Sequence, residues 1–124
     1  MHYWLVFLGG GLGAALRHGV NRLALQAWGS DFPAGTMIVN VTGSLAIGLL
    51  VGLFAAQPSI NPSTRLFLTT GLLGGFTTFS TFSLDALALW ERGAIGPWLA
   101  YVAGSVLLSL LAAALGFLAA RAFA

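Results

Sequence analysis

Residues 66–90 read LFLTTGLLGGFTTFSTFSLDALALW, and this stretch decides the architecture that we expect. Its length suits a helix that crosses a membrane, because each helical residue rises about 1.5 Å and the hydrocarbon layer is about 30 Å thick. Near its middle, Gly74 and Gly75 are followed closely by Thr77 and Thr78. Glycine and threonine are weaker helix formers than leucine or alanine. The sequence therefore predicts a membrane helix that is broken near its centre.

Three further apolar stretches have the length of a membrane span. They cover residues 3–26, 36–56 and 97–120, and turn-forming residues separate the four stretches at 29–33, 57–63 and 91–97. Only 6% of the 124 residues are charged, against roughly a quarter in a soluble domain. So few charges cannot cover the surface of a soluble globule of this size. We therefore predict an all-α membrane protein whose residues 1–124 form a single four-helix transmembrane domain.

The composition also argues against several other functions. The chain has no cysteine, which removes disulfides, thiolate metal sites and cysteine nucleophiles. Five basic residues face three acidic ones, and they are too few and too scattered for a nucleic-acid surface. The only histidines are His2 and His18, and no set of nucleophile, base and acid is apparent. We expect neither an enzyme nor a nucleic-acid-binding protein.

The arginines leave the orientation in the membrane open. If the number of spans is even, two arginines lie on the side of the N-terminal amine and three lie on the other side. The first group is Arg65 and Arg121, and the second is Arg17, Arg22 and Arg92. The positive-inside rule needs an imbalance of such charges, and here the count is equal once the amine is included. Either the chain inserts both ways up and pairs as an antiparallel dimer, or one arginine dominates and fixes a single orientation.

Arg17 lies deep in the first apolar stretch. An arginine at the bilayer centre costs about 2.5–3.5 kcal/mol on insertion scales. Arg17 should therefore reach the interface or face a water-filled vestibule. His18, Arg22 and Gln26 follow at four-residue steps, which also fits a helix end that emerges into the lipid headgroups.

Glycines recur at the spacing that favours close helix packing. Gly9 and Gly13 in the first stretch, and Gly48 and Gly52 in the second, form GxxxG patterns. Without a Cβ, such faces let two helices approach closely in lipid. We expect both pairs to lie at contacts between helices.

Two of the predicted helices carry neutral polar side chains at four-residue steps. These are Thr36, Asn40 and Ser44 in the second stretch, and Tyr101, Ser105 and Ser109 in the fourth. Residues four apart share a helix face, so each helix carries a track of hydrogen-bonding groups. Such groups can donate to an anion, and Asp85 is the only carboxylate within the spans. The tracks indicate either an ion pathway or hydroxyls that bond to their own helix or join two helices.

Phenylalanines recur at three-residue steps after the glycine pair. They are Phe76, Phe79 and Phe82. The edge of an aromatic ring is electropositive, so ring edges could line the path of an anion. The alternative is a stripe of aromatic packing.

Residues 74–83 resemble the signature of the CrcB/Fluc family of fluoride channels. Residues 35–44 and 13–17 resemble two further motifs of that family, and the likeness covers essentially the whole chain. The resemblance implies an antiparallel, dual-topology homodimer in the lipid bilayer that passes fluoride passively and lowers cytoplasmic fluoride, with strong selectivity over chloride. The family is common in bacterial inner membranes, so the cell inner membrane is the implied location.

The resemblance also implies roles for individual residues. The pore-lining residues would be Asn40, Phe79, Phe82, Tyr101, Ser105 and Ser109. Backbone carbonyls of Gly74 and Thr77 from both subunits would hold a structural Na⁺ at the dimer interface. Asp85 departs from the pattern, because the family usually has glutamate there. The shorter carboxylate leaves an entrance role for that residue open.

Two other classes of membrane protein compete with a channel. A small proton-coupled exporter needs a carboxylate inside the membrane to exchange protons against its substrate, and residues 3–26, 36–56 and 97–120 contain none. A structural membrane subunit would carry no flux when it is reconstituted alone. Reconstitution of the purified protein therefore distinguishes a channel, a proton-coupled exporter and a structural subunit.

Overall fold

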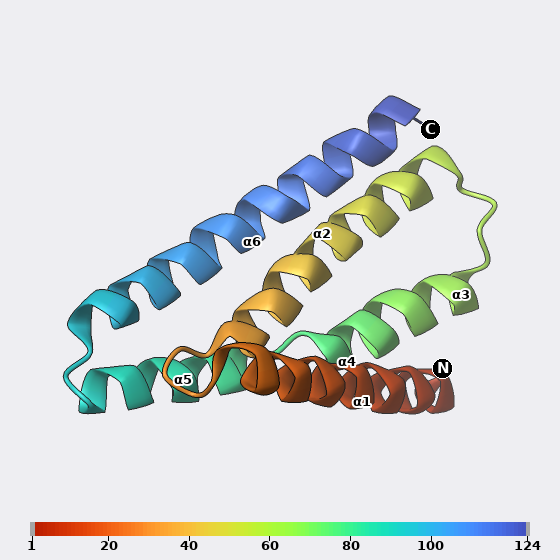
Figure 1. Ribbon diagram of the computed structural model, residues 1–124. Helices are drawn as coiled ribbons and strands as arrows, with labels where there is room; N and C mark the ends of the chain where they lie inside the picture. Colours follow the sequence, from red (N-terminus) through yellow and green to blue (C-terminus); the bar gives the residue numbers. More distant parts are fainter. Residues whose placement is uncertain (1, 124) are drawn as a thin grey trace.

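The computed structural model describes residues 2–123, and helices account for most of them (Figure 1). In chain order the elements are α1 (Tyr3–Trp28), α2 (Ala34–Ala56), α3 (Pro62–Leu66), the π-helical segment η1 (Phe67–Leu73), α4 (Gly74–Phe76), α5 (Phe79–Glu91) and α6 (Ile95–Phe123). Residues 2–123 contain no strand. The prediction of an all-α protein is confirmed. The third helical stretch is built from α3, η1, α4 and α5 in succession.

Turn residues end the helices in the three predicted connections. Gly29 follows α1 with φ at 76°, and Gly93 follows α5 with φ at 72°, a left-handed conformation that glycine adopts without steric cost. Asn61 begins α3, where its side-chain oxygen accepts a hydrogen bond from the Ser63 N–H at 2.7 Å. Proline at position 62 suits the first turn of α3. The N–H groups of a first turn have no acceptor within the helix, so the N–H that proline lacks costs no hydrogen bond. Local turn chemistry thus sets where the long helices start and stop.

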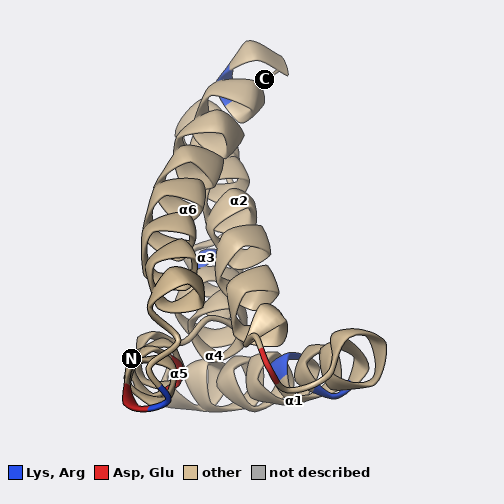
Figure 2. Cartoon of the chain, turned by 60° about the vertical axis from the view of Figure 1, so that its left-hand side comes forward, with Lys and Arg blue, Asp and Glu red and all other residues tan. Residues whose placement is uncertain are grey.

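The helices pack in two main pairs. Helix α2 lies beside α6, and α1 lies beside η1 and α4 (Figures 1 and 2). In the first pair, a Cβ on Gly48 would overlap the Ala113 carbonyl of α6. In the second pair, a Cβ on Gly9 would lie 2.9 Å from the Phe67 carbonyl oxygen, and one on Gly13 would overlap the Leu72 carbonyl. Both GxxxG faces therefore lie at close helix contacts, as their spacing predicts.

The third stretch changes backbone conformation along its length. Helix α4 ends at Phe76, and Thr77 and Thr78 are extended, with ψ at 158° and 122°. The Thr77 N–H and hydroxyl both donate to the Leu73 carbonyl, at 3.0 and 2.9 Å, which closes the last turn. Helix α5 then begins at Phe79, after a short non-helical link (Figure 1). We call Thr77 and Thr78 the linker.

Within residues 2–123, three segments are long and apolar enough to cross a membrane. They are Ala34–Ala56, Pro62–Glu91 and Ile95–Phe123. Helix α1 has 26 residues, which is long enough, but it is not among the three. The polar stripe from Arg17 to Gln26 lowers the hydropathy of its second half. The chain is therefore a multi-pass membrane protein.

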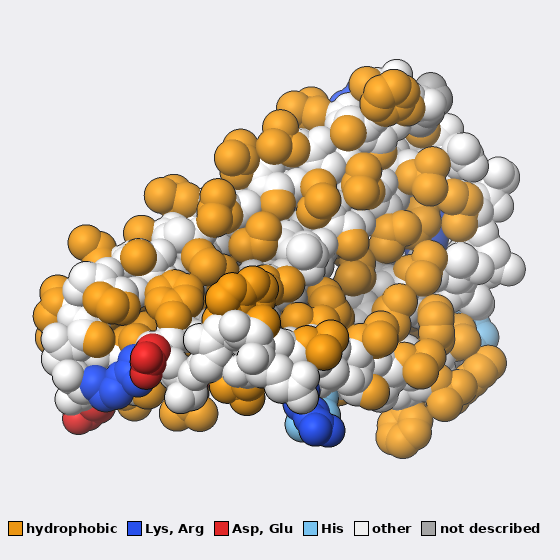
Figure 3. Space-filling view, in the orientation of Figure 1, with side chains coloured by type: hydrophobic (Ala, Val, Ile, Leu, Met, Phe, Trp, Pro, Cys, Tyr) orange, Lys and Arg blue, Asp and Glu red, His pale blue; other side chains and the backbone are white. Residues whose placement is uncertain are grey.

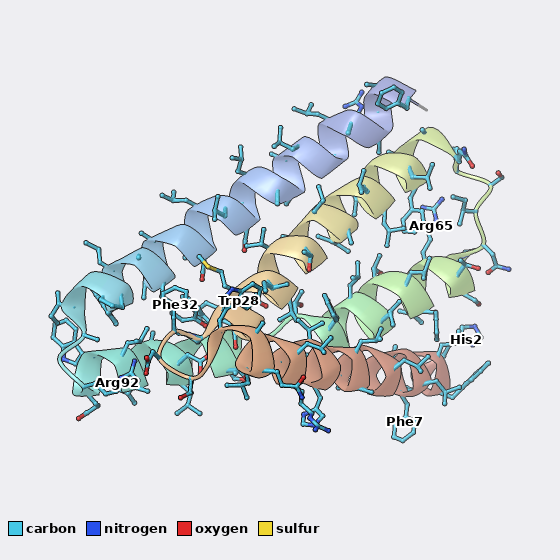
Figure 4. The ribbon with its side chains drawn as sticks, in the orientation of Figure 1. His2, Phe7, Trp28, Phe32, Arg65 and Arg92 are labelled. Atoms are coloured by element: carbon cyan, nitrogen blue, oxygen red, sulfur yellow. The ribbon has the colours of Figure 1, made fainter. Side chains whose placement is uncertain are left out.

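The surface agrees with a lipid environment. Large apolar side chains are exposed along α1 and α6 and cover most of the visible face (Figure 3). The few charged residues lie on α1, α3 and α5, in the connections and near the end of α6 (Figure 2). Phe7, for example, is 79% exposed and points away from the other helices (Figure 4). Water would disfavour such a surface, whereas hydrocarbon accepts it.

Arg65 is held at one end of the molecule, between the end of α2 and α3 (Figure 4). Its guanidinium donates to the carbonyls of Gln57 and Ile60, at 3.3 Å each. It also lies 5.1 Å from the ring centroid of Phe54. These contacts fix the positive charge beside the α2–α3 connection.

Candidate functional site

A cavity of about 380 Å³ opens beside the linker, between α2, α5 and α6. Its polar lining comprises Asn40 and Ser44 of α2, both linker threonines, and Ser105 and Ser109 of α6. Apolar side chains, among them Phe79 and Phe82 of α5, complete the wall. Among residues 2–123, no charged side chain lines this cavity. We call it the linker cavity.

The structure brings five of the six expected pore-lining residues to this one cavity. They are Asn40, Phe79, Phe82, Ser105 and Ser109. The sixth, Tyr101, is fully buried behind the wall, where its ring lies 5.2 Å from that of Phe82. Its hydroxyl donates to a carboxylate oxygen of Asp85 at 3.1 Å.

Ser105 has a buried hydroxyl that lacks a partner. The residue is only 4% exposed, and its Oγ forms no hydrogen bond within residues 2–123. A buried polar atom without a partner is unusual and calls for water, an ion or a ligand. Since Ser105 lines the linker cavity, its hydroxyl is available to whatever occupies that space.

The two α5 phenylalanines take different positions. Phe82 is 8% exposed and forms part of the packed core with Tyr101 and Leu89. Phe79 is 77% exposed, although it lines the same cavity and its ring lies 5.5 Å from that of Phe82. Phe82 is therefore a fixed wall of the cavity, and Phe79 projects from the chain surface at its edge.

The linker is held by a side chain from another helix. The Asn40 side-chain oxygen accepts a hydrogen bond from the Thr78 N–H at 2.7 Å, and its Nδ2 donates to the Thr78 carbonyl at 2.9 Å. The Thr78 hydroxyl in turn accepts from the Thr81 N–H at 3.1 Å and so caps α5. These bonds satisfy both backbone groups of Thr78, which apolar surroundings would otherwise make costly.

The same bonds divert two donors that a continuous helix would use. In an α-helix the Thr78 N–H would donate to the Gly74 carbonyl, and the Thr81 N–H to the Thr77 carbonyl. Here these N–H groups go to Asn40 and to the Thr78 hydroxyl instead. Across residues 2–123, no donor replaces them at either carbonyl. Gly74 and Thr77 thus offer free carbonyl oxygens, the kind of ligand that broken membrane helices present to Na⁺.

Arg17 reaches the end of α4. Its Nε donates to the Gly75 carbonyl at 3.1 Å, and the residue is only partly exposed. His18 and Arg22, which follow Arg17 on α1, are exposed instead. Arg17 therefore supports a helix C-terminus with a cation, which is the favourable sign for that end of the helix dipole.

A second cavity, of about 300 Å³, lies near the α1–α2 connection. Its polar side chains include Asn21 of α1, Thr36 of α2, and Thr81 and Asp85 of α5. The sequence interpretation missed it. Asn21, an amide four residues after Arg17 in the polar half of the first stretch, was the available signal, but it belongs to neither of the two tracks of neutral polar residues.

The fold and its site define an all-helical membrane protein with an uncharged polar cavity beside an interrupted helix. The chain belongs to the CrcB family. The pattern that defines this family, described as "CrcB-like protein, Camphor Resistance (CrcB)", matches residues 4–117.

Curated relatives resemble the chain over most of its length. A protein of Methylobacterium nodulans is 63% identical over 102 residues, which cover 82% of each chain. One of Methylobacterium sp. strain 4-46 is 56% identical over 96% of this chain and 95% of its own. One of Rhizobium meliloti is 50% identical over 98% of this chain and 97% of its own. All three carry the name "Fluoride-specific ion channel FluC".

Proposed function

We propose that this chain is a fluoride-specific ion channel that passes F⁻ passively across the membrane and so lowers cytoplasmic fluoride. The observation that carries the proposal is membership of the CrcB family, with relatives named as fluoride channels that match nearly the whole chain. The chain is a transport protein rather than an enzyme.

The linker cavity supports this function through its chemistry. Fluoride is small and strongly hydrated, so a pore must replace its water with well-placed donors. Hydroxyls of Ser105 and Ser109 and the Asn40 amide lie together there, beside the rings of Phe79 and Phe82. Positive ring edges and neutral donors attract an anion without a fixed cation that would trap it. Tyr101, behind Phe82, would continue the polar path towards the second cavity.

A structural Na⁺ fits the free carbonyls of the linker. Gly74 and Thr77 would contribute one carbonyl oxygen each, and a second copy would contribute the same pair, on the dimer axis. Such an ion would supply a fixed positive charge that holds the two linkers together. The site would be built from backbone oxygens, because no cluster of three His, Cys, Asp or Glu side chains occurs in the part of the chain described.

The working unit would be an antiparallel homodimer in the cell inner membrane. Each subunit would cross four times, with α1 as the first crossing and the linker near the bilayer centre. The balanced arginines support insertion in both orientations. The exposed ring of Phe79 supports a partner at that edge of the cavity.

Efflux from liposomes tests the proposal directly. Purified protein is reconstituted with trapped potassium fluoride or chloride, and an electrode reads the released anion. Fast fluoride loss with little chloride loss is the expected result. Asn40→Ala and Phe79→Ala should impair it. Thr42→Ala is the control, because the Thr42 hydroxyl is exposed and donates to the Ile38 carbonyl of its own helix at 2.6 Å.

The alternatives predict different results. A proton-coupled exporter would move its substrate only when a pH gradient is imposed, and its rate would follow that gradient. A structural subunit would release neither anion. Absence of fluoride efflux from folded, reconstituted protein would overturn the channel assignment.

A further inference from the structure

We infer that Asn40 is a positioning residue that keeps the chain open between α4 and α5, in addition to lining the cavity. Its side chain forms two hydrogen bonds to one residue of the linker, at 2.7 Å to the Thr78 N–H and 2.9 Å to the Thr78 carbonyl. The two partners lie 38 positions apart in the sequence, so the bonds are tertiary. We call these two hydrogen bonds between Asn40 and Thr78 the clamp. Its importance for permeation rests on the proposed function, whereas its existence does not.

The extended backbone of Thr78 explains why an amide side chain fits. With φ at −153° and ψ at 122°, its N–H and C=O point to the same side, as in a strand. A carboxamide presents an acceptor and a donor with the matching separation, so Asn40 takes the place of a neighbouring strand. The assignment of its oxygen and nitrogen is forced, because the N–H needs an acceptor and the carbonyl needs a donor.

The clamp also keeps the linker from returning to a helix. A continuous helix would need the Thr78 N–H on the Gly74 carbonyl, and Asn40 holds that N–H. The Gly74 carbonyl is thereby left free. Asn40 therefore controls a backbone oxygen that it does not touch.

The clamp limits what Asn40 can offer to an ion. A primary amide has two N–H groups, and one of them is committed to the Thr78 carbonyl. One N–H remains for the cavity. The buried, unpartnered hydroxyl of Ser105 is a further donor in the cavity that is free without breaking an existing bond.

Nuclear magnetic resonance of the threonines tests the clamp without reference to transport. The protein is labelled with ¹³C and ¹⁵N threonine, and the Cα, Cβ and amide shifts of Thr78 are compared between variants. Wild type and Thr42→Ala should both show the shifts of an extended residue. In Asn40→Ala the Thr78 Cα should move downfield and its Cβ upfield, towards helical values. Unchanged Thr78 shifts in Asn40→Ala would overturn the inference.

Asn40→Asp provides a second, independent reading if Asn40→Ala does not fold. A carboxylate still accepts from the Thr78 N–H, and a charged acceptor forms the shorter, stronger bond. The Thr78 amide proton should therefore move downfield, while fluoride efflux falls at least about tenfold because the donor is lost. An amide proton that does not move would contradict the clamp. A wild-type protein without fluoride efflux would contradict the proposed function alone.

Discussion

Polar side chains on the helices form hydrogen bonds of two kinds, within their own helix and to other elements. Thr42, Thr69 and Ser83 each donate to the carbonyl four positions earlier, which is the ordinary solution for a hydroxyl in lipid. Asn40 and Arg17 instead bond to the backbone of other elements, Asn40 to Thr78 within the linker and Arg17 to Gly75 shortly before it. Bonds within one helix and bonds between elements are therefore both observed, whereas the ion pathway stays a prediction.

Ser105→Ala should separate function from stability. The Ser105 hydroxyl is buried and has no partner within the described chain, so its removal should leave the melting temperature unchanged or slightly raise it. Fluoride efflux should fall roughly tenfold, because a free donor leaves the cavity. Ser83→Ala is the control, since the exposed Ser83 hydroxyl bonds to the Phe79 carbonyl of its own helix. A destabilised Ser105→Ala protein with normal efflux would show that the hydroxyl serves packing.

Arg17→Gln should destabilise the protein more than Arg22→Gln. Arg17 donates from a partly buried position to the Gly75 carbonyl, and hydrogen bonds to charged groups contribute about 1.5–3 kcal/mol. Arg22 is exposed, so its replacement should change the free energy of unfolding by less than about 0.5 kcal/mol. Thermal unfolding in detergent compares the two. Equal melting temperatures would contradict the support of α4 by Arg17.

At the scale of the elements, glycine contacts decide how closely the helices pack. Gly48 and Gly116 both lie where α2 meets α6, and a Cβ on either would overlap backbone of the opposite helix. Gly75 meets the Gly10 backbone of α1 in the same way. Close backbone contact replaces hydrophobic burial as the source of stability in lipid.

Gly48→Ala tests this packing. The new methyl group would overlap the Ala113 carbonyl, and backbone cannot move aside as a side chain can, so a loss of about 1–3 kcal/mol is expected. Gly19→Ala is the matched control on α1, because nothing lies within 4 Å of a Cβ there. That change should be neutral or stabilise by up to about 1 kcal/mol through helix propensity. Chemical or thermal unfolding of both variants gives the comparison, and an undisturbed Gly48→Ala would contradict the contact.

The position of the linker shows which part of the fold can be predicted from the sequence and which cannot. Weak helix formers predicted an interruption around the two glycines and the two threonines, and the structure has Gly74 and Gly75 helical and Thr77 and Thr78 extended. Close packing of Gly75 on α1 favours helix there, and Asn40, far away in sequence, holds Thr78 extended. Helix lengths and glycine faces follow from local periodicity. Such tertiary bonds do not, which is why the sequence indicated the glycine–threonine region as a whole and not the two residues that are extended.

The residues of the candidate site could likewise be predicted only in part from the sequence. Four-residue spacing placed Asn40, Ser105 and Ser109 on faces that do meet at one cavity. The same spacing put Tyr101 with the serines, but its long side chain reaches Asp85 instead of the linker cavity. Periodicity gives the face of a helix and not the reach of a side chain.

At the scale of the whole molecule, a bound cation should contribute to stability. If Na⁺ occupies the free carbonyls of Gly74 and Thr77, replacing sodium with a large organic cation should lower the melting temperature of the dimer. Binding that stabilises only the folded state adds about 2.7 kcal/mol when the ligand is a hundredfold above its Kd. The melting temperature is followed across a sodium titration at constant ionic strength. Independence from sodium would contradict the proposed site.

The positive charges are balanced between the two sides of the membrane, so they leave the orientation of the chain open. Labelling of a single cysteine can test it. The chain has no cysteine, so a single Ser59→Cys change in the exposed α2–α3 connection provides one reactive position. Arg65 lies beside that connection and is tied to its carbonyls, so its charge cannot move away from this side. With equal charge on both sides, an impermeant maleimide added to intact vesicles should label about half of the protein. Labelling of nearly all or almost none would instead mean one orientation, and an antiparallel dimer would then be excluded.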